Sequence, residues 1–427
     1  MTAGAGAEPA ALENAAMHRE SQLVVSAMVC VLALSAQAAG QEQPDGVPKD
    51  RLERLTRGVN LSMWFAQLPP DAERFKNYIK AEDIRLIKRL GFRHVRLIVD
   101  PKALMNPGNP GQLKEQHLKL LDAAIDMILA EKLAIVVCPY ADNEYKHFIC
   151  TRAGDRLAFG AFLRAFVGHL SRRDPELVFL QVLNEPSLPN PELWNRVQEE
   201  LIPQMRRSAP KHTLIASSNM RNARGGWDLV GGMEALKPVA DANVVYDFHF
   251  YDPVQFTHQG ATWMTWQVQH YENLPYPSSP DVIAPFIEKI SNQGARDFAE
   301  LYGREKWNRD RIERQIMRAV TWAKKHNVPI ICGEFGCYRR NTPAADRLTY
   351  LRDVREVLEK HNVGWAMWDY LGDFGVVTEK DGKRVPDEDT AAALGLPGAK
   401  DAKTPASKPA PSGEKGNPEP GTQNTDP

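Results

Sequence analysis

The sequence predicts an α/β fold in which eight parallel strands and their helices alternate around a closed (β/α)8 barrel, the TIM barrel architecture. Eight short apolar segments recur along the chain, and helix-length segments with an apolar stripe separate most of them. An open, doubly wound sheet is the structural alternative, but it normally carries a glycine-rich phosphate turn after its first strand, and none is present. The length of 427 residues suits one large barrel domain better than several small ones.

The eight predicted strands share runs of apolar residues that stop at a polar residue or a turn. They cover residues 57–65, 94–100, 134–140, 178–186, 213–218, 243–251, 329–336 and 363–370. Strands that are buried on both faces consist of such nearly continuous apolar runs. In the fourth run, Pro186 cannot continue the hydrogen-bond ladder, so the strand must end there. Residues 41–54 are expected to be a polar lead-in to the first strand.

Helices are predicted between the strands wherever apolar residues recur at intervals of three or four. Ile84, Ile87 and Leu90 form such a stripe, and Gly91 is suited to the helix end. Further helices are predicted around residues 118–128, 157–170, 191–208, 312–323 and 348–358. Each of these segments can bury one apolar face against the barrel.

The two ends of the chain differ in composition from the predicted barrel domain, which spans residues 41–395. Residues 1–38 look like a short extension followed by a secretory signal, because basic residues after Met17 precede an apolar run and small residues. We expect the natural start at Met17 and cleavage after Ala38, with a retained membrane anchor as the alternative. Residues 396–427 are rich in proline, glycine, lysine and serine, which predicts a disordered tail.

Composition excludes several classes of partner. The 53 basic and 54 acidic residues nearly cancel, which argues against nucleic acid or an anionic membrane surface. The cysteines that remain after cleavage, too few for a disulfide scaffold, are Cys138, Cys150, Cys332 and Cys337. Cys332 is expected to be a buried thiol, while pairing of Cys138 with Cys150 or of Cys332 with Cys337 stays open. Their spacing does not resemble a zinc site, so no metal or cofactor is predicted.

Polar residues terminate several predicted strands and would meet on one rim of the barrel. They are Arg96, Asn184, Glu185, His249, Tyr251, Glu334 and Trp368. The carboxyl ends of barrel strands form the rim on which active sites are built. His249 and Tyr251 are two residues apart and therefore point to the same side of their strand. Taken singly, Glu185 also fits a surface residue before a turn, and His249 a core histidine.

Two glutamates on different strands suit the cleavage of a glycosidic bond. The leaving oxygen must be protonated while the anomeric carbon becomes positively charged, so one carboxyl acts as an acid and the other is an anion. Arg96 is expected to keep Glu334 ionised, and Tyr251 to orient it. Glu185, farther from positive charge, is expected to stay protonated longer.

Together these residues resemble glycoside hydrolase family 5, the cellulase family of the retaining hydrolase clan, over roughly residues 57–370. The family's Asn-Glu-Pro after strand four is similar to Asn184, Glu185 and Pro186, and its strand-seven glutamate is similar to Glu334. The resemblance implies that Glu185 is the acid/base and Glu334 the nucleophile. Its supporting arginine, histidine, tyrosine and tryptophan are matched, in order along the chain, by Arg96, His249, Tyr251 and Trp368.

Further sugar contacts are expected from Asn184, which can address a hydroxyl, and from aromatic faces. Family members commonly carry a histidine at the end of strand three, where this chain instead offers Tyr140 or Asp142. The aromatic candidates are Trp368, Trp64 at the end of the first strand, and Trp263 and Trp266 in the long segment 252–310. For most aromatic residues of that segment, a small satellite core is the alternative.

We therefore expect a retaining glycoside hydrolase acting on a β-linked polysaccharide, specifically an endo-β-1,4-glucanase. A β-mannanase or another β-glucanase of the same family is the alternative on substrate. A noncatalytic carbohydrate-binding barrel, accessory to polysaccharide export, is the alternative of another class, although such a protein would be expected to lose one glutamate. We expect a secreted or periplasmic monomer that binds polysaccharide or oligosaccharide, with no stable membrane insertion after signal removal.

Overall fold

The chain folds into the predicted barrel. The computed structural model describes residues 46–397, and its main sheet is a closed parallel barrel in which the first and last strands pair. In order around the barrel, the strands are β1 (Arg57–Phe65), β2 (His94–Val99), β5 (Ala134–Pro139), β6 (Val178–Gln181), β7 (Leu214–Ser217), β8 (Val244–Phe250), β9 (Ile330–Phe335) and β10 (Gly364–Met367). Each strand lies within its predicted segment, so the (β/α)8 prediction is confirmed.

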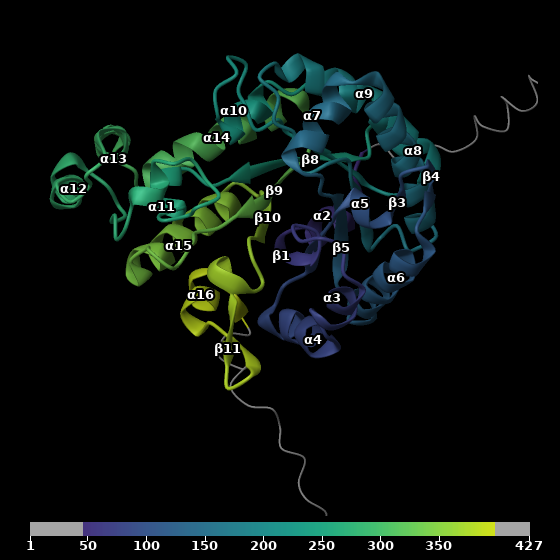
Figure 1. Ribbon diagram of the computed structural model, residues 1–427, viewed down its shortest axis with the longest axis horizontal. Coiled ribbons are helices and arrows are strands. Elements are labelled where there is room, and N and C mark those ends of the chain that lie inside the picture. The colour runs from purple at the N-terminus through teal and green to yellow at the C-terminus, as the bar shows by residue number, and fades with distance from the viewer. Residues whose placement is uncertain (1–45, 398–427) are drawn as a thin grey trace, which may run out of the picture.

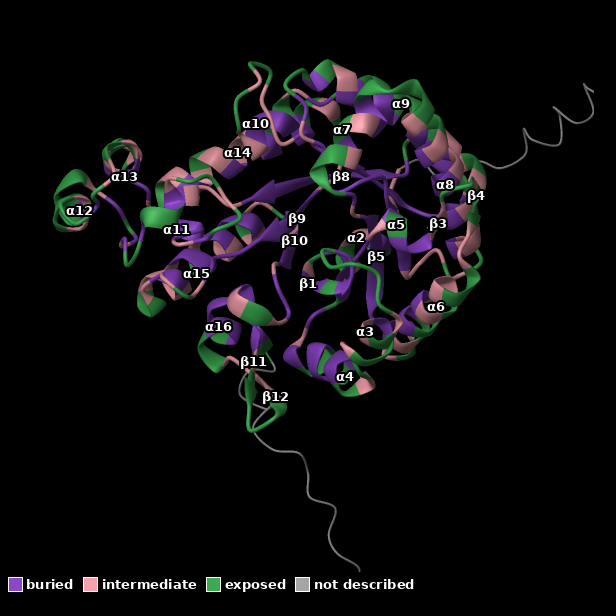
Figure 2. Cartoon of the chain, in the orientation of Figure 1, coloured by how far each residue is buried: buried purple, intermediate pink, exposed green. Residues whose placement is uncertain are grey.

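Helices cover the outside of the barrel (Figure 1). Those that contain the predicted apolar stripes are α4 (Ala81–Leu90), α6 (Glu115–Ala130), α8 (Ala153–Leu170), α9 (Pro191–Ser208), α14 (Arg309–His326) and α15 (Ala344–Lys360). Figure 2 shows the strands buried and the exposed residues gathered on the outward faces of these helices. Burial of one stripe per helix explains why the period of three to four residues is visible in the sequence.

The amino-terminal end of the barrel is closed by a helix that the sequence did not predict. Residues 46–54 lie in the expected polar lead-in, but the chain forms α2 (Lys49–Arg54) there. Leu52 packs with Leu55 against the layer of inward-facing side chains at the barrel floor. The side chain of Arg51 is buried and donates hydrogen bonds to Glu176 and to the carbonyl of Lys211. The few apolar residues of this charged stretch, Val47, Leu52 and Leu55, therefore cover the barrel floor.

Shorter elements occupy the connections between strands and helices. The helices are α3 (Ala72–Asn77), α5 (Pro101–Leu104), α7 (Asn143–Thr151) and α10 (Leu229–Glu234). An antiparallel pair, β3 (Met105–Asn106) and β4 (Asn109–Leu113), lies between α5 and α6. Among residues 46–397, no helix is long and apolar enough to cross a membrane.

The long segment between β8 and β9 carries its own small core. Its elements are α11 (Val254–Thr257), the 3-10 turn η1 (Val268–His270), α12 (Pro280–Ile287) and α13 (Gln293–Glu305). Val268, Tyr271 and Leu274 pack there against residues of α13, while Phe256 and Tyr276 are buried in the main core. In Figure 1, α12 and α13 extend to the left of the barrel. Phe256, Tyr271 and Tyr276 are therefore core residues, in agreement with the alternative that most aromatic residues of this segment pack the protein and do not contact sugar.

The chain after the barrel remains folded up to its last described residues. The 3-10 turn η2 (Gly372–Phe374) leads into a hairpin of β11 (Val377–Lys380) and β12 (Lys383–Pro386), and α16 (Glu388–Ala393) follows. Leu396, the first residue of the predicted tail, is buried in the main core. The remainder of that predicted tail and the predicted signal segment lie outside the described residues.

Candidate active site

Strand register brings the predicted polar residues together at the carboxyl end of the barrel. Asn60 of β1 lies opposite Arg96 of β2, and His249 of β8 lies opposite Glu334 of β9. Asn184 follows β6, and its backbone N–H donates to the carbonyl of Pro139 at the end of β5. Side chains that stand on neighbouring strands at the same level face the same space inside a barrel.

Glu334 is held from two sides and is almost completely buried. Arg96 Nη1 donates to Glu334 Oε1 at 2.6 Å, and Tyr251 Oη donates to Glu334 Oε2 at 3.0 Å. Glu334 is 4% exposed and Arg96 is 1% exposed. Charge-assisted hydrogen bonds of this kind, in the absence of bulk water, fix both the position and the orientation of a carboxylate.

Glu185 is more exposed than Glu334, and its longer contacts come from a histidine and an amide. Its Oε1 lies 2.8 Å from Nδ1 of His249, and Asn184 donates to its Oε2 at 3.3 Å. The backbone of Glu185 has a φ of 44°, in the left-handed region that a non-glycine residue enters at an energetic cost. Its side chain keeps 19% of its surface exposed. A strained turn thus presents this carboxyl to the open side of the site.

The two carboxyl groups and His249 form a compact cluster. One ligand atom from each of Glu185, His249 and Glu334 lies within 4.8 Å of the others. Such a set can approach a cation, but both nitrogens of His249 already face carboxylates, and Arg96 is bonded to Glu334. The charges of the cluster therefore pair with one another, and its chemistry fits proton transfer better than metal binding.

The charge states differ from the sequence expectation. Burial acts to raise the pKa of Glu185, but the hydrogen bond and positive charge of His249 lower it to about 2. Burial raises the pKa of Glu334, against the opposing charges of His249 and Arg96. Burial acts against the imidazolium of His249, yet Glu334 and Asp247 raise its pKa to about 10. These directions are opposite to the expectation that Glu185 stays protonated longer, because His249 Nδ1 lies 2.8 Å from Glu185 Oε1 and lowers its pKa.

A polar layer beneath the site was missed by the sequence reasoning. Asp247 is 2% exposed; its Oδ2 lies 3.3 Å from His249 Nε2 and accepts from Gln181 Nε2 at 2.6 Å. Gln181 also accepts from Arg96 Nε at 3.0 Å, and Asn60 accepts from Arg96 Nη1 at 3.0 Å. Asp247 stands two residues before His249, so the same alternation that paired His249 with Tyr251 could have identified it.

The predicted aromatic contacts divide into two groups. Trp368 and Tyr140 are half-buried and pack on a common small cluster that contains Cys138. Burial and the charge of Glu185 raise the pKa of Tyr140. Asp142 does not fill the strand-three position, because it caps α7 and pairs with Lys102. Cys138 is a buried free thiol, like the three other described cysteines, and accepts from Arg96 at 3.4 Å.

Trp64 does not join the site. It is 1% exposed, and its indole N–H donates to the carbonyl of Phe75 at 2.8 Å, so it belongs to the core next to α3. Trp263 is 58% exposed and meets Tyr338 edge-on at 5.0 Å between ring centroids. Tyr338 shares a cluster with Trp368 and Tyr251, so Trp263 extends the aromatic surface of the site.

Trp266 packs within the long segment between β8 and β9. A Cβ atom at Gly294 of α13 would lie 2.7 Å from its ring, and 49% of its surface is exposed. The glycine therefore makes room for the indole, which lies against α13.

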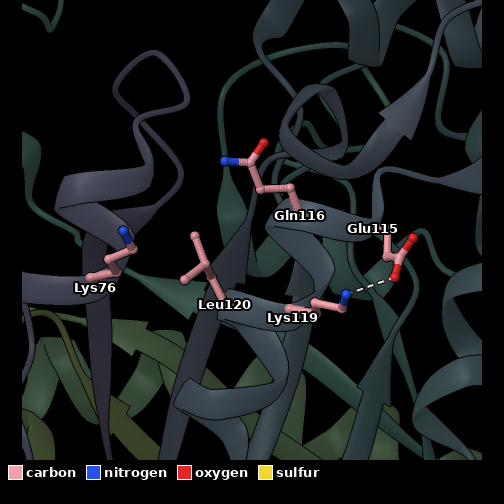
Figure 3. A pocket seen from close by; sticks show the side chains of 5 residues that line it. All are labelled: Lys76, Glu115, Gln116, Lys119 and Leu120. Carbon is pink, nitrogen blue, oxygen red and sulfur yellow. Dashed lines mark ion pairs between the residues drawn. The ribbon is translucent and has the colours of Figure 1, made fainter.

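The hollow shown in Figure 3 lies elsewhere on the surface. Lys76 of α3 and four residues of α6 line it, and Lys119 pairs with Glu115 across one edge at 2.7 Å. None of the predicted site residues lies among these five, and all the charged groups in it are solvent-exposed surface residues. This hollow therefore does not compete with the cluster at the barrel rim as the site of chemistry.

Comparison with known sequences agrees with the geometry. The family described as Cellulase (glycosyl hydrolase family 5) matches residues 56–373. Endoglucanase 3 of Fibrobacter succinogenes is 24% identical over 364 residues, which is 81% of this chain but only 53% of the relative, so the chain spans about half its length. Endoglucanase C of Acetivibrio thermocellus is 26% identical over 338 residues, 78% of this chain and 95% of the relative.

Solved structures show the same fold. Cel5A of Thermotoga maritima, determined in complex with cellobiose, is 25% identical with a TM-score of 0.64, covering 81% of this chain and 99% of that structure. The same enzyme in complex with mannotriose substrate is 24% identical with a TM-score of 0.65 over the same shares. Because the family match covers well over half of the sequence, this chain belongs to glycosyl hydrolase family 5 and is an endoglucanase-like glycoside hydrolase.

Proposed function

We propose that this chain is a retaining endo-β-1,4-glucanase in which Glu185 is the acid/base and Glu334 the nucleophile. The observation that carries this proposal is the close approach of the two carboxyl groups, with an oxygen of each within 4.8 Å of the other. Retaining glycosidases place their carboxyl groups about 5 to 5.5 Å apart, whereas inverting enzymes need about 6.5 to 9.5 Å to admit a water molecule.

Glu334 suits the role of nucleophile because its position is fixed. Arg96 and Tyr251 each bond one of its oxygens, so little reorganisation is needed when it attacks the anomeric carbon. In that step the bond between the anomeric carbon and the leaving oxygen breaks, and an ester to Glu334 forms. Arg96 then stabilises the carboxylate that leaves when water releases the sugar.

Glu185 suits the role of acid/base because its side chain stays partly exposed and one of its oxygens contacts an imidazole. His249 Nδ1 lies 2.8 Å from Glu185 Oε1, and exclusion of water by a bound sugar would favour the neutral pair, in which the proton has moved to Glu185 and left a neutral imidazole. The remaining N–H of His249 then faces Asp247. Glu185 donates the proton to the leaving oxygen and afterwards accepts one from the attacking water.

The substrate class follows from the neutral, aromatic character of the rim. Trp368, Tyr140 and Trp263 offer flat apolar faces for pyranose rings, which suits an extended glycan. The curated relatives are named endoglucanases, which favours β-1,4-glucan. The mannotriose complex of a similar structure keeps β-mannan as the second candidate.

We also propose that the protein is exported. A polysaccharide substrate cannot cross the cell membrane, so the enzyme must meet it outside the cytoplasm. The apolar run and small residues before Ala38 supply the sequence basis for this proposal. Determination of the amino-terminal residue of protein recovered from the periplasm or medium tests it, and an intact start at Met17 would contradict cleavage.

The direct test compares soluble β-1,4-glucan, mixed-linkage glucan, β-1,3-glucan and β-mannan, with product sizing and NMR of the first product formed. We expect β-1,4-glucan to be cleaved internally into oligosaccharides whose new reducing ends begin as the β-anomer. The Glu334→Gln variant is the matched control, because it keeps the shape of the site and removes the nucleophile.

Each other outcome has a defined meaning. First formation of the α-anomer would contradict retention. Faster cleavage of mannan would replace the glucanase assignment by mannanase, and release of only the terminal sugars would indicate exo action. A wild-type protein that hydrolyses none of the four glycans would contradict the proposed substrate class altogether.

A further inference from the structure

A buried lysine next to the site has no bonding partner within the described residues. Lys146 lies on α7 and is 4% exposed. Its Nζ lies 5.7 Å from the centroid of the Tyr140 ring, but within residues 46–397 it makes no hydrogen bond or ion pair. Its ammonium is not among the fully enclosed polar atoms without a partner, so its tip reaches space open to solvent.

A buried ammonium without a partner is unfavourable, because it has lost water and gained no hydrogen bond. Burial lowers the pKa of Lys146, and the charges of Glu185 and Glu334 oppose that change. Lys102 provides the contrast on the same side of the molecule: it is exposed and pairs with Asp142, the cap of α7. The fold therefore pairs Lys102 and leaves Lys146 without a hydrogen bond or ion pair among the described residues.

The charges around Lys146 favour a neutral ligand over an anionic one. Three basic and three acidic side chains gather in this region: Arg96, His249 and Lys146 against Glu185, Glu334 and Asp247. Because these charges balance, a carboxylate on the ligand would add an uncompensated negative charge beside the two glutamates. A sugar hydroxyl accepts a hydrogen bond from an ammonium without that penalty.

We propose that Lys146, steadied by the ring of Tyr140, is a specificity-determining residue that donates hydrogen bonds to the hydroxyl groups of a neutral sugar ring bound beside Glu185. The inference rests on the proposed glycanase function and names a donor of its glycan site. It also explains why the lysine is unpaired within the described residues: the substrate supplies its acceptor. The ring of Tyr140, over which the ammonium lies, packs on the same small cluster as Trp368, and this places the contact at the rim of the site.

The test compares Lys146→Met with Lys102→Met on neutral cello-oligosaccharides and on whichever neutral glycan the wild type cleaves best. Loss of hydrogen bonds from a charged donor predicts a fall in kcat/KM of about 10- to 100-fold for Lys146→Met. The midpoint of thermal unfolding should stay equal or rise, since an unpaired buried charge has been removed. Lys102→Met should change kcat/KM by less than about twofold, as expected for an exposed ion pair.

Two results would overturn the inference: unchanged kcat/KM in Lys146→Met, or a clear fall in its unfolding midpoint, which indicates a structural lysine. Lys146→Gln, which keeps a neutral donor, provides a second variant and should recover part of the loss if hydrogen bonding is the cause. A loss confined to carboxylated glucans would also overturn it, because the acceptor would then be a carboxylate. An inactive wild type contradicts the proposed function instead, and the unfolding midpoint still tests the lysine.

Discussion

The two glutamates of the site stand in contrasting surroundings. Glu334 is on a strand, is nearly buried, and is bonded by a guanidinium and a phenol. Glu185 is on a strained turn after a strand, is partly exposed, and is bonded to one histidine and one amide. The difference matches the proposed division of tasks, in which Glu334 is held still as the nucleophile and Glu185 exchanges a proton.

The comparison also shows that positive charge is not concentrated on Glu334. His249 Nδ1 lies 2.8 Å from an oxygen of Glu185 and 3.6 Å from an oxygen of Glu334, so the imidazole is close to both carboxyl groups. Ionisable groups that lie this close together titrate as a coupled set. Substituting one residue of the site at a time tests whether Glu334 and Glu185 differ in their catalytic tasks.

The largest expected effect is that of Glu334→Ala. Without a nucleophile the glycosyl-enzyme cannot form, so hydrolysis should fall to background. Added azide can enter the vacated space and attack the anomeric carbon, and NMR should identify an inverted glycosyl azide. Undiminished hydrolysis would remove Glu334 from the role of nucleophile.

Glu185→Ala should have the next largest effect. Loss of general acid/base assistance costs about 10²- to 10⁴-fold in rate. The loss should be smaller for aryl glycosides, whose leaving groups need little protonation, and azide should give a glycosyl azide of retained configuration. If both alanine variants gave the same azide anomer, the distinction between the two glutamates would fail.

Tyr251→Phe should have an intermediate effect. It deletes one of the two hydrogen bonds that position Glu334 and leaves the ring in place. We expect kcat to fall by about 10- to 100-fold, the value of a hydrogen bond to a charged group, with KM nearly unchanged. A rise in KM with constant kcat would instead assign this hydroxyl to substrate binding.

The smallest expected effect is on stability and concerns His249. Because its pKa is raised from 6.5 to about 10 in the folded protein, its contribution is complete below pH 6.5 and is lost as the pH rises towards 10. The midpoint temperature of thermal unfolding of the wild type should therefore decrease as the pH is raised from 6.5 to about 10. His249→Asn should lose less over the same interval, and equal losses would show that His249 is not the group responsible.

Much of the fold was predictable because barrel strands and helices have local signatures. All eight strands were placed by their apolar runs, and the amphipathic helices by their stripes. The end of β6 was not predicted correctly. The predicted run continues to Pro186, but the strand stops at Gln181, and Asn184 and Glu185 follow it outside the strand. A run of apolar residues does not show where its backbone leaves the sheet.

Residues whose surroundings come from distant parts of the chain were beyond local patterns. Trp64 stands near the end of the first strand, where a rim aromatic is expected, but it lies in the core. Its indole N–H donates to the backbone carbonyl of Phe75 there. Lys146 carries a charge that normally stays in water, yet α7 buries it. Leu52 and Leu396 looked like parts of polar termini, and both pack on the folded body.

By itself, the sequence determined the alternation of strands and helices and the order of the polar residues that end the strands, since both are local properties of the chain. Only the tertiary structure decided which charges meet. His249 and Glu185 are 64 positions apart and Arg96 and Glu334 are 238 apart, so their contacts depend on barrel closure and strand register. Because pKa depends on those distances and on burial, the protonation of the two glutamates could be read only after the barrel was closed.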